Sequence, residues 1–284
     1  MKTGKTKINQ GKYSEYINLC ILGILSVITL FPVYFLFVNS FKSQEEIVQS
    51  PIALPSNWDV SYLLQAAEKI NVFESMLNTV FITVASVCLI VVLSITIAWI
   101  MVRSKSKFLN IVFLSFTAAM LIPFQTVMYP LVSLMEGVGL KNSFGLIIMY
   151  AGFGLSMSVL LYHGFLKSVP LSLEEAAIID GANLFQLFRY VIFPLVAPTT
   201  STIVIINAVW IWNDYLLPFL IIGNNSSKTL ILSLYYAKNI SGQYGNPWEL
   251  IFPAVLICVI PIFIIYAVLQ RNIIEGISAG AVKG

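Results

Sequence analysis

Long apolar stretches alternate with short polar segments along this chain of 284 residues. Each stretch reaches about 20 residues, the length at which a helix crosses the hydrocarbon core of a bilayer. Apolar residues run continuously within each stretch and do not alternate with period two, so helices are predicted rather than barrel strands. The pattern predicts an all-α polytopic membrane protein with six transmembrane helices. The six stretches lie at residues 16–38, 76–102, 109–135, 143–166, 199–222 and 250–269.

Composition supports a membrane protein. Hydrophobic residues make up 58% of the chain and charged residues 10%, whereas soluble domains have about 45–50% and about 25%. The net charge of +3 is too small to indicate a nucleic-acid partner. The cysteines, Cys20, Cys88 and Cys258, lie inside apolar runs and predict neither a disulfide framework nor a metal site.

The first apolar stretch has a basic lead, as a signal peptide does. It is longer than the usual 7–15 residues of a signal peptide, and no small-residue cleavage site follows it. We therefore interpret it as a retained anchor.

Lysine and arginine predict the orientation, because they favour cytoplasmic segments. If both termini are cytoplasmic, the inner segments hold more than twice as many of these residues as the outer segments. The predicted inner set is Lys2, Lys5, Lys7, Lys12, Arg103, Lys105, Lys107, Lys167, Arg189, Arg271 and Lys283. We expect a cytoplasmic segment at 1–15, an extracytoplasmic loop at 40–75, further cytoplasmic segments at 170–194 and 270–284, and one transmembrane domain over 1–284.

The third stretch contains Pro123 and Pro130, with Gln125 between them. Each proline removes a backbone donor and clashes with the preceding turn, so a bent helix is predicted. The bend fits either a helix beside a moving pathway or a static packing kink, and both interpretations stay open here.

The fifth stretch is interrupted by polar residues beside tryptophans. An ionisable group at membrane depth is costly and tends to face a bundle interior or water. Aromatic faces beside amides and a carboxylate suit sugar binding, but an interfacial aromatic belt has the same composition. The candidate substrate-pathway or gate residues are Gln125, Asn207, Trp212, Asn213 and Asp214.

No catalytic motif is present. The segment "GNNSSKT" at 223–229 is one residue too short for a phosphate loop and has serine in place of the glycine before lysine. No zinc-protease motif, nucleophile elbow or paired-carboxylate arrangement occurs. We expect a non-enzymatic chain that binds no cofactor or metal.

The predicted cytoplasmic segment "SLEEAAIIDGANLFQLFRYVIFPLVAP" at 172–198 has an acidic helix start, a glycine and two prolines within an otherwise apolar chain. Ser172 and Glu175 fit a capping box, Gly181 fits a left-handed helix stop, and Asn183 with Gln186 repeats the capping pattern. Pro194 and Pro198 are expected to close the second helix. The segment therefore predicts two short helices that meet at a glycine.

This helix pair fits a protein partner better than a membrane surface. Surface-bound helices carry lysine-rich polar faces, but here the first helix is acidic, and an anionic inner leaflet would repel it. Ala176 and Ala177 would allow close approach of another surface, and Leu184, Phe185, Leu187 and Phe188 add an apolar grip.

The same segment resembles the EAA motif of ABC-importer permeases, which is E-A-A, three residues, a glycine and a hydrophobic ending before proline. "IPFQTVMYPL", "GLKNS", "WNDYLLPFL" and the tail "QRNIIEGISAGAVKG" resemble the carbohydrate branch and occur in order. The likeness covers nearly the whole chain. The chain is identified as a member of this family, similar to the second, MalG-type membrane subunit of maltose-type importers.

The resemblance implies a MetI/maltose-type fold in a bacterial cell membrane. It implies a second, related permease, two copies of an ABC ATPase that use ATP and Mg, an extracytoplasmic binding protein and a sugar substrate. The coupling helix would contact the ATPase, the tail would reach between the ATPases, and an outer loop would reach the binding protein. The implied coupling residues are Glu174, Glu175, Ala176, Ala177, Asp180, Gly181, Ala182 and Phe185; the tail residues are Glu275, Gly276 and Gly280; the loop residues are Gly242, Gln243 and Tyr244.

Two alternatives remain open. The same architecture serves polyol or glycerol phosphate permeases, although a phosphate cargo should bring arginines into the pore and the predicted spans hold none deep inside. An independent secondary transporter would need its own ion site, and Asp214 is the one carboxylate well inside a predicted span.

Overall fold

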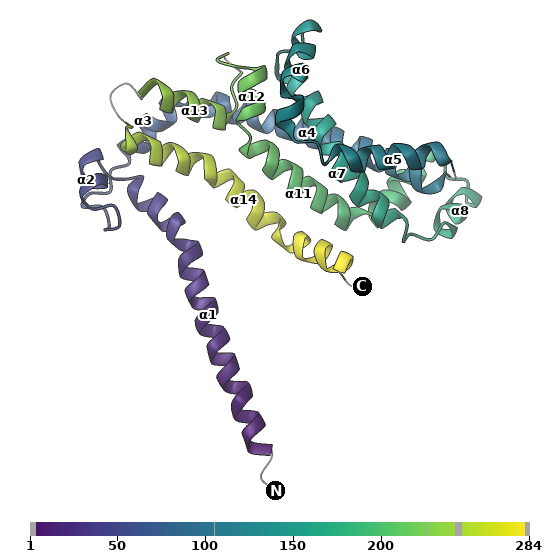
Figure 1. Ribbon diagram of the computed structural model, residues 1–284, viewed down its shortest axis with the longest axis horizontal. Coiled ribbons are helices and arrows are strands. Elements are labelled where there is room, and N and C mark those ends of the chain that lie inside the picture. Colours follow the sequence, from purple (N-terminus) through teal and green to yellow (C-terminus); the bar gives the residue numbers. More distant parts are fainter. Residues whose placement is uncertain (1–3, 105, 226, 242–245, 282–284) are drawn as a thin grey trace. The chain divides into compact units, whose positions relative to one another are not determined.

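A computed structural model describes residues 4–281 except 105, 226 and 242–245 (Figure 1). Every regular element in this part of the chain is a helix, as predicted. The elements are α1 (Gly4–Asn39), α2 (Gln44–Gln49), α3 (Ser61–Lys69), α4 (Val72–Arg103), α5 (Lys107–Ala119), α6 (Phe124–Gly137), α7 (Ser143–Leu166), α8 (Ser172–Ile179), α9 (Leu184–Leu187), the π-helix η1 (Phe188–Ile192), α10 (Phe193–Leu195), α11 (Ala197–Asn213), α12 (Leu216–Ile221), α13 (Leu230–Ser241) and α14 (Trp248–Ala281).

Among the described residues, four helices are long and apolar enough to cross a membrane, and two bent pairs raise the number to as many as six. The four are the Glu15–Asn39 part of α1, α4, α7 and the Trp248–Ala267 part of α14. The bent pairs are α5 with α6, and Leu184–Leu195 with α11. The predicted count of six is therefore reached if each bent pair forms one span.

The chain divides into two compact units. The first unit comprises Met1–Ile70 and Ala237–Cys258, and the second comprises Asn71–Tyr236 and Val259–Gly284. One boundary between them lies between α3 and α4, and the others fall within α13 and α14. The expectation of one transmembrane domain stays a prediction.

Polar contacts order the loop region of the first unit. The Lys42 side chain is buried, and its Nζ donates to the Ser50 carbonyl at 2.8 Å, at the end of α2. Burial lowers the pKa of Lys42, and the nearby carboxylate of Glu46 opposes this shift. Gln44 donates to the Asn246 carbonyl and accepts from the Trp248 amide, which joins α2 to the start of α14.

The core of the second unit is built on α4 and α7, the most extensively packed helix pair, with α11 packed against both and α5 against α7. Tyr150 and Tyr162 of α7 are fully buried. Each phenol is satisfied by α11 or the residue after it: Tyr162 donates to Thr200 Oγ1 at 2.8 Å and Tyr150 to Asp214 Oδ2 at 2.9 Å. Polar bonds thus fix α11 against α7 at two levels.

A close approach of three helices occurs at Gly154 of α7. A Cβ atom there would lie 2.5 Å from Ile90 Cδ1 of α4 and 2.6 Å from Asn207 Oδ1 of α11. Both distances are shorter than van der Waals contact allows, so glycine permits this packing. Gly152, two positions earlier on the same helix, has nothing within 4 Å of its Cβ position.

We expect Gly154→Ala to destabilise the chain by about 1–3 kcal/mol, the usual cost of overpacking a core. Gly152→Ala is the matched control, since it adds the same methyl group in open space and gains helix propensity. Thermal unfolding of the two purified variants in one detergent is the measurement. Equal melting temperatures for both variants would contradict the close approach.

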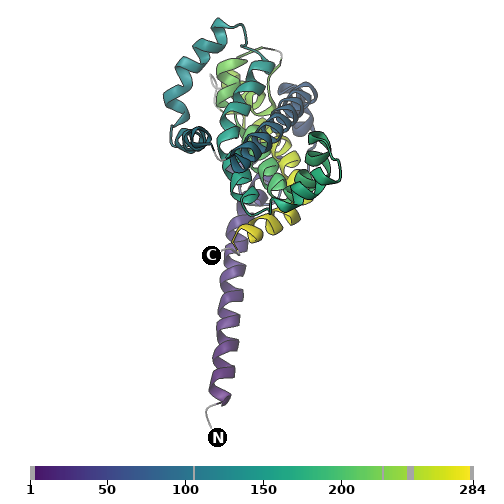
Figure 2. The same cartoon turned by 90° about the vertical axis from the view of Figure 1, so that its right-hand side faces the viewer.

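The third predicted span, 109–135, is two helices and not one bent helix. α5 ends at Ala119, α6 begins at Phe124, and the two make an angle of 106°, a change of direction visible in Figure 2. Pro123 is the N-cap of α6 in extended geometry, and a proline there cannot continue the preceding helix. Pro130, in contrast, lies inside α6.

The fifth predicted span, 199–222, is also interrupted. α11 ends at Asn213, and a separate helix, α12, begins at Leu216. Asp214 has extended backbone geometry between them. Apolar residues resume directly after Asn213 and Asp214, and for that reason the length of the stretch alone predicted one helix.

Candidate functional site

The loop between α7 and α11 holds the predicted helix pair, with α8 and α9 meeting at Gly181. Gly181 has a φ of +85°, the left-handed geometry that favours glycine. Its amide donates to the Ile178 carbonyl, and the Ala182 amide donates to the Ala177 carbonyl. These two bonds form a Schellman motif, which confirms the predicted glycine stop.

The two predicted capping boxes have opposite outcomes. At α9 the box is present: Asn183 Oδ1 accepts from the Gln186 amide, and Gln186 Oε1 accepts from the Asn183 amide. At α8 the prediction is wrong, because the N-cap is Leu171 and no side-chain cap bond forms. Pro170 precedes a turn already in helical geometry, in which the Glu174 and Glu175 amides donate to the Leu171 carbonyl. Ser172 therefore lies one position too late to cap.

The prediction that Pro194 closes the second helix is wrong. The helix continues to Leu195 of α10 because its preceding turn is widened into the π-helix η1, where the Phe193 amide donates to the Phe188 carbonyl. Proline offers no amide to the carbonyl four residues earlier, and a wide turn relieves its clash with that carbonyl. The chain then bends by 78° into α11, with Pro198 in the first turn.

The outward surface of this helix pair is mixed acidic and apolar. Ile179 and Phe185 are 84% and 73% exposed, and Glu175, Ala176 and Asp180 are also exposed. Ala177 and Ala182 are half-buried. We call Glu175, Ala176, Ile179, Asp180 and Phe185 the α8–α9 face.

Glu174 lies on the opposite side of α8 and is the only buried residue of that helix. Its Oε1 accepts from Arg103 Nε at 2.8 Å and from Arg103 Nη2 at 2.5 Å, and its Oε2 accepts from Trp99 Nε1 at 2.9 Å. Both partners belong to the last turns of α4. The sequence had placed Glu174 and Glu175 together in one role, whereas the structure turns only Glu175 outward.

Trp99 and Arg103 were missed by sequence reasoning. They lie four residues apart and so share one face of α4, but some 70 positions separate them from Glu174. A groove of about 360 Å³ runs beside them and is also lined by Glu175, Ile178 and Leu184.

Asp214 occupies the break between α11 and α12. Its carboxylate accepts from the Leu216 amide at 2.9 Å, from the Leu217 amide at 3.4 Å and from the Tyr150 hydroxyl at 2.9 Å. The Trp210 ring packs edge-on against Tyr150, with ring centroids 5.4 Å apart. The carboxylate thus caps α12 and joins the break to α7.

The other pathway candidates are scattered. Asn207 is buried, donates to Ser158 Oγ and the Ile203 carbonyl, and lines a largely apolar cavity of about 710 Å³ among α5, α6, α7 and α11. Trp212 is buried and Asn213 exposed. Gln125, in the first turn of α6, is exposed. Only Asn207 of the five candidates lines this cavity, so the structure does not gather them into one site.

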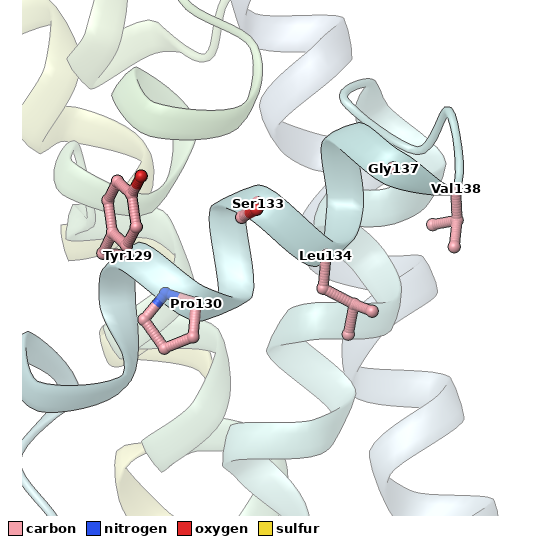
Figure 3. A pocket seen from close by; sticks show the side chains of 6 residues that line it. All are labelled: Tyr129, Pro130, Ser133, Leu134, Gly137 and Val138. Atoms are coloured by element: carbon pink, nitrogen blue, oxygen red, sulfur yellow. The ribbon is translucent and has the colours of Figure 1, made fainter.

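A second hollow, of about 550 Å³, lies along α6 itself (Figure 3). All its lining side chains come from one side of α6 and its C-terminal turn: Tyr129, Pro130, Ser133, Leu134, Gly137 and Val138. Tyr129 is 82% exposed, and none of these side chains carries a charge. The hollow is a surface of one helix without converging polar groups.

The remaining predicted contacts fall where less is described. Gly242, Gln243 and Tyr244 of the expected binding-protein loop lie outside the described residues. Glu275, Gly276 and Gly280 of the expected tail lie within the helical backbone of α14, but their side chains are outside the described part of the chain.

Comparison with known proteins gives consistent matches. The chain is 41% identical over 266 residues to the probable starch degradation products transport system permease protein AmyC of Thermoanaerobacterium thermosulfurigenes, covering 93% of this chain and 96% of that protein. It is 36% identical to the multiple sugar-binding transport system permease protein MsmG of Streptococcus mutans, covering 98% of each.

A crystal structure of a bacterial ABC transporter involved in the import of the acidic polysaccharide alginate matches with a TM-score of 0.78 and 24% identity, covering 92% of this chain and 97% of that chain. This likeness establishes the fold as that of an ABC-transporter permease. The pattern of the family described as "binding-protein-dependent transport system inner membrane component" matches residues 90–278. The chain belongs to this family of inner-membrane transport components.

Proposed function

We propose that this chain is the permease subunit of a sugar ABC importer and that its cargo is an oligosaccharide. The relatives named for starch degradation products and for multiple sugars support this cargo, since each matches over nearly its full length. The chain forms half of the translocation pore, and a second, related permease forms the other half. An extracytoplasmic binding protein delivers the sugar.

The observation that carries the proposal is the outward presentation of the α8–α9 face. A helix pair fixed by a Schellman motif and a capping box places Glu175, Ile179 and Phe185 in solvent. Exposed apolar side chains beside a carboxylate mark a surface for a protein partner. Two copies of an ATPase, which bind the ATP and Mg, dock on this face and on its counterpart in the second permease. This chain binds no cofactor and catalyses no reaction.

In this arrangement the α8–α9 face and both termini are cytoplasmic, in agreement with the larger number of lysine and arginine residues in the inner segments taken together. The protein resides in a bacterial cell membrane with several spans. ATP-driven closure of the ATPases moves α8, and the helices behind it switch the pore between inward-facing and outward-facing states.

The test is reconstitution of the full chain in proteoliposomes with the ATPase, the second permease and the binding protein of its cell of origin. Calorimetry of the binding protein with a panel of oligosaccharides first identifies the sugar. We expect uptake of that sugar only when ATP and all subunits are present. Uptake by this chain alone, driven by an ion gradient without the ATPase, would overturn the proposal in favour of a secondary transporter.

A further inference from the structure

One buried charge joins α8 to the end of α4. Glu174 is the only buried residue of α8, and its side chain is 4% exposed against 17% for the Arg103 side chain. Both carboxylate oxygens are occupied, one by Arg103 and the other by the Trp99 indole. The orientation of Glu174 is therefore fixed from two directions.

The same two α4 residues also reach the segments that flank α8. Arg103 Nη2 donates to the Val169 carbonyl, just before α8, at 3.2 Å. The Trp99 ring packs edge-on against Phe188 of η1, with ring centroids 5.2 Å apart. The end of α4 thus binds the segment before α8, α8 itself and the π-helix after it. We call Trp99, Arg103 and Glu174 the clamp.

α4 is well placed to pass a movement of α8 on to other helices, because it packs along α7 and also contacts α11. On the C-terminal side of α8 the covalent path to the bundle runs through the Gly181 turn, the π-helix η1 and the 78° bend into α11, and on its N-terminal side residues 167–171 join it to α7. The charge pair adds a direct connection from α8 to α4, and this connection has a fixed geometry.

Stability alone gives a weak reason for the pair. Desolvation of a buried ion pair offsets most of its attraction, and apolar residues of similar volume serve stability equally well. A planar guanidinium that donates from two nitrogens fixes the orientation of the carboxylate, which apolar packing does not do.

We propose that the clamp is a mechanical link: Glu174 is a positioning residue through which displacement of α8 by the ATPase is passed to α4 and so to the pore helices. This inference rests on the proposed function of the chain. It assigns Glu174 an internal role, distinct from the outward contact of Glu175.

A double-mutant cycle in the reconstituted importer tests the link. Arg103→Met and Glu174→Gln each leave one polar partner unmatched, so either single variant should assemble poorly. The double variant removes the unmatched charge and should assemble to within about twofold of wild type. Its sugar imported per ATP hydrolysed should nevertheless fall by about fivefold or more, the lower range of coupling factors between sites.

The exposed pair of Glu136 and Lys141 supplies a matched control. Glu136→Gln breaks an ion pair on the surface and should change neither assembly nor the ratio of sugar to ATP. A double clamp variant that assembles and imports sugar with the wild-type ratio would overturn the link and leave the pair a stabilising element only.

If the double variant does not assemble, the Arg103→Lys variant tests the mechanical link instead. It keeps the positive charge, but a single ammonium replaces the rigid donor fork. Assembly with a lowered ratio of sugar to ATP is expected, and assembly with the wild-type ratio would overturn the link. Absence of ATP-driven uptake by the wild-type complex would instead refute the proposed function, which separates the two failures.

Discussion

Glu175→Lys is expected to abolish docking of the ATPase and, with it, ATP-driven sugar uptake. Glu175 is exposed on the α8–α9 face, flanked by apolar side chains that would exclude water from an interface. In such a setting a reversed charge faces the group that formerly attracted it, at a cost of several kcal/mol. The amount of ATPase that co-purifies should fall by about tenfold or more.

The control for this prediction is Glu68→Lys, which reverses an exposed carboxylate on α3 of the first unit. The two variants change the net charge equally, so a difference between them reflects position alone. Co-purification from detergent and binding-protein-stimulated ATP hydrolysis are measured together. Normal values of both in Glu175→Lys would show that the α8–α9 face is not the docking surface.

Features that depend on nearby residues could be predicted from the sequence. Long apolar runs indicate membrane helices because each helix must by itself be long and apolar enough to cross the bilayer. The helix stop at Gly181 and the capping box of Asn183 and Gln186 could likewise be predicted, since each involves residues a few positions apart. The fold class and the position of the helix pair followed from these signals.

Features that depend on distant residues could not be predicted in this way. Nothing near Glu174 indicates that it pairs with Arg103, 71 positions away, and nothing near Asp214 indicates the hydroxyl of Tyr150, 64 positions away. The tertiary contact decides which of two adjacent glutamates turns inward. Local rules also erred at Ser172, where the turn after Pro170 had already begun the helix.

The role of Asp214 distinguishes an importer subunit from an independent secondary transporter. Its carboxylate accepts two backbone amides at the start of α12 and the hydroxyl of the fully buried Tyr150. This set of bonds assigns the carboxylate a structural task in the broken helix. A proton- or ion-coupled site, in contrast, would need a group that changes its charge or its ligands during transport.

Asp214→Ala should destabilise the protein by about 2–4 kcal/mol, because it removes a helix cap and leaves a buried hydroxyl without its acceptor. Asp214→Asn keeps an amide oxygen that caps α12, so it should retain the fold and at least about half of the ATP-driven uptake. Thermal unfolding and uptake, measured on the same preparations, distinguish the two variants. A normally folded Asp214→Asn protein without any uptake would instead indicate that the charge itself acts in transport, as the secondary-transporter alternative requires.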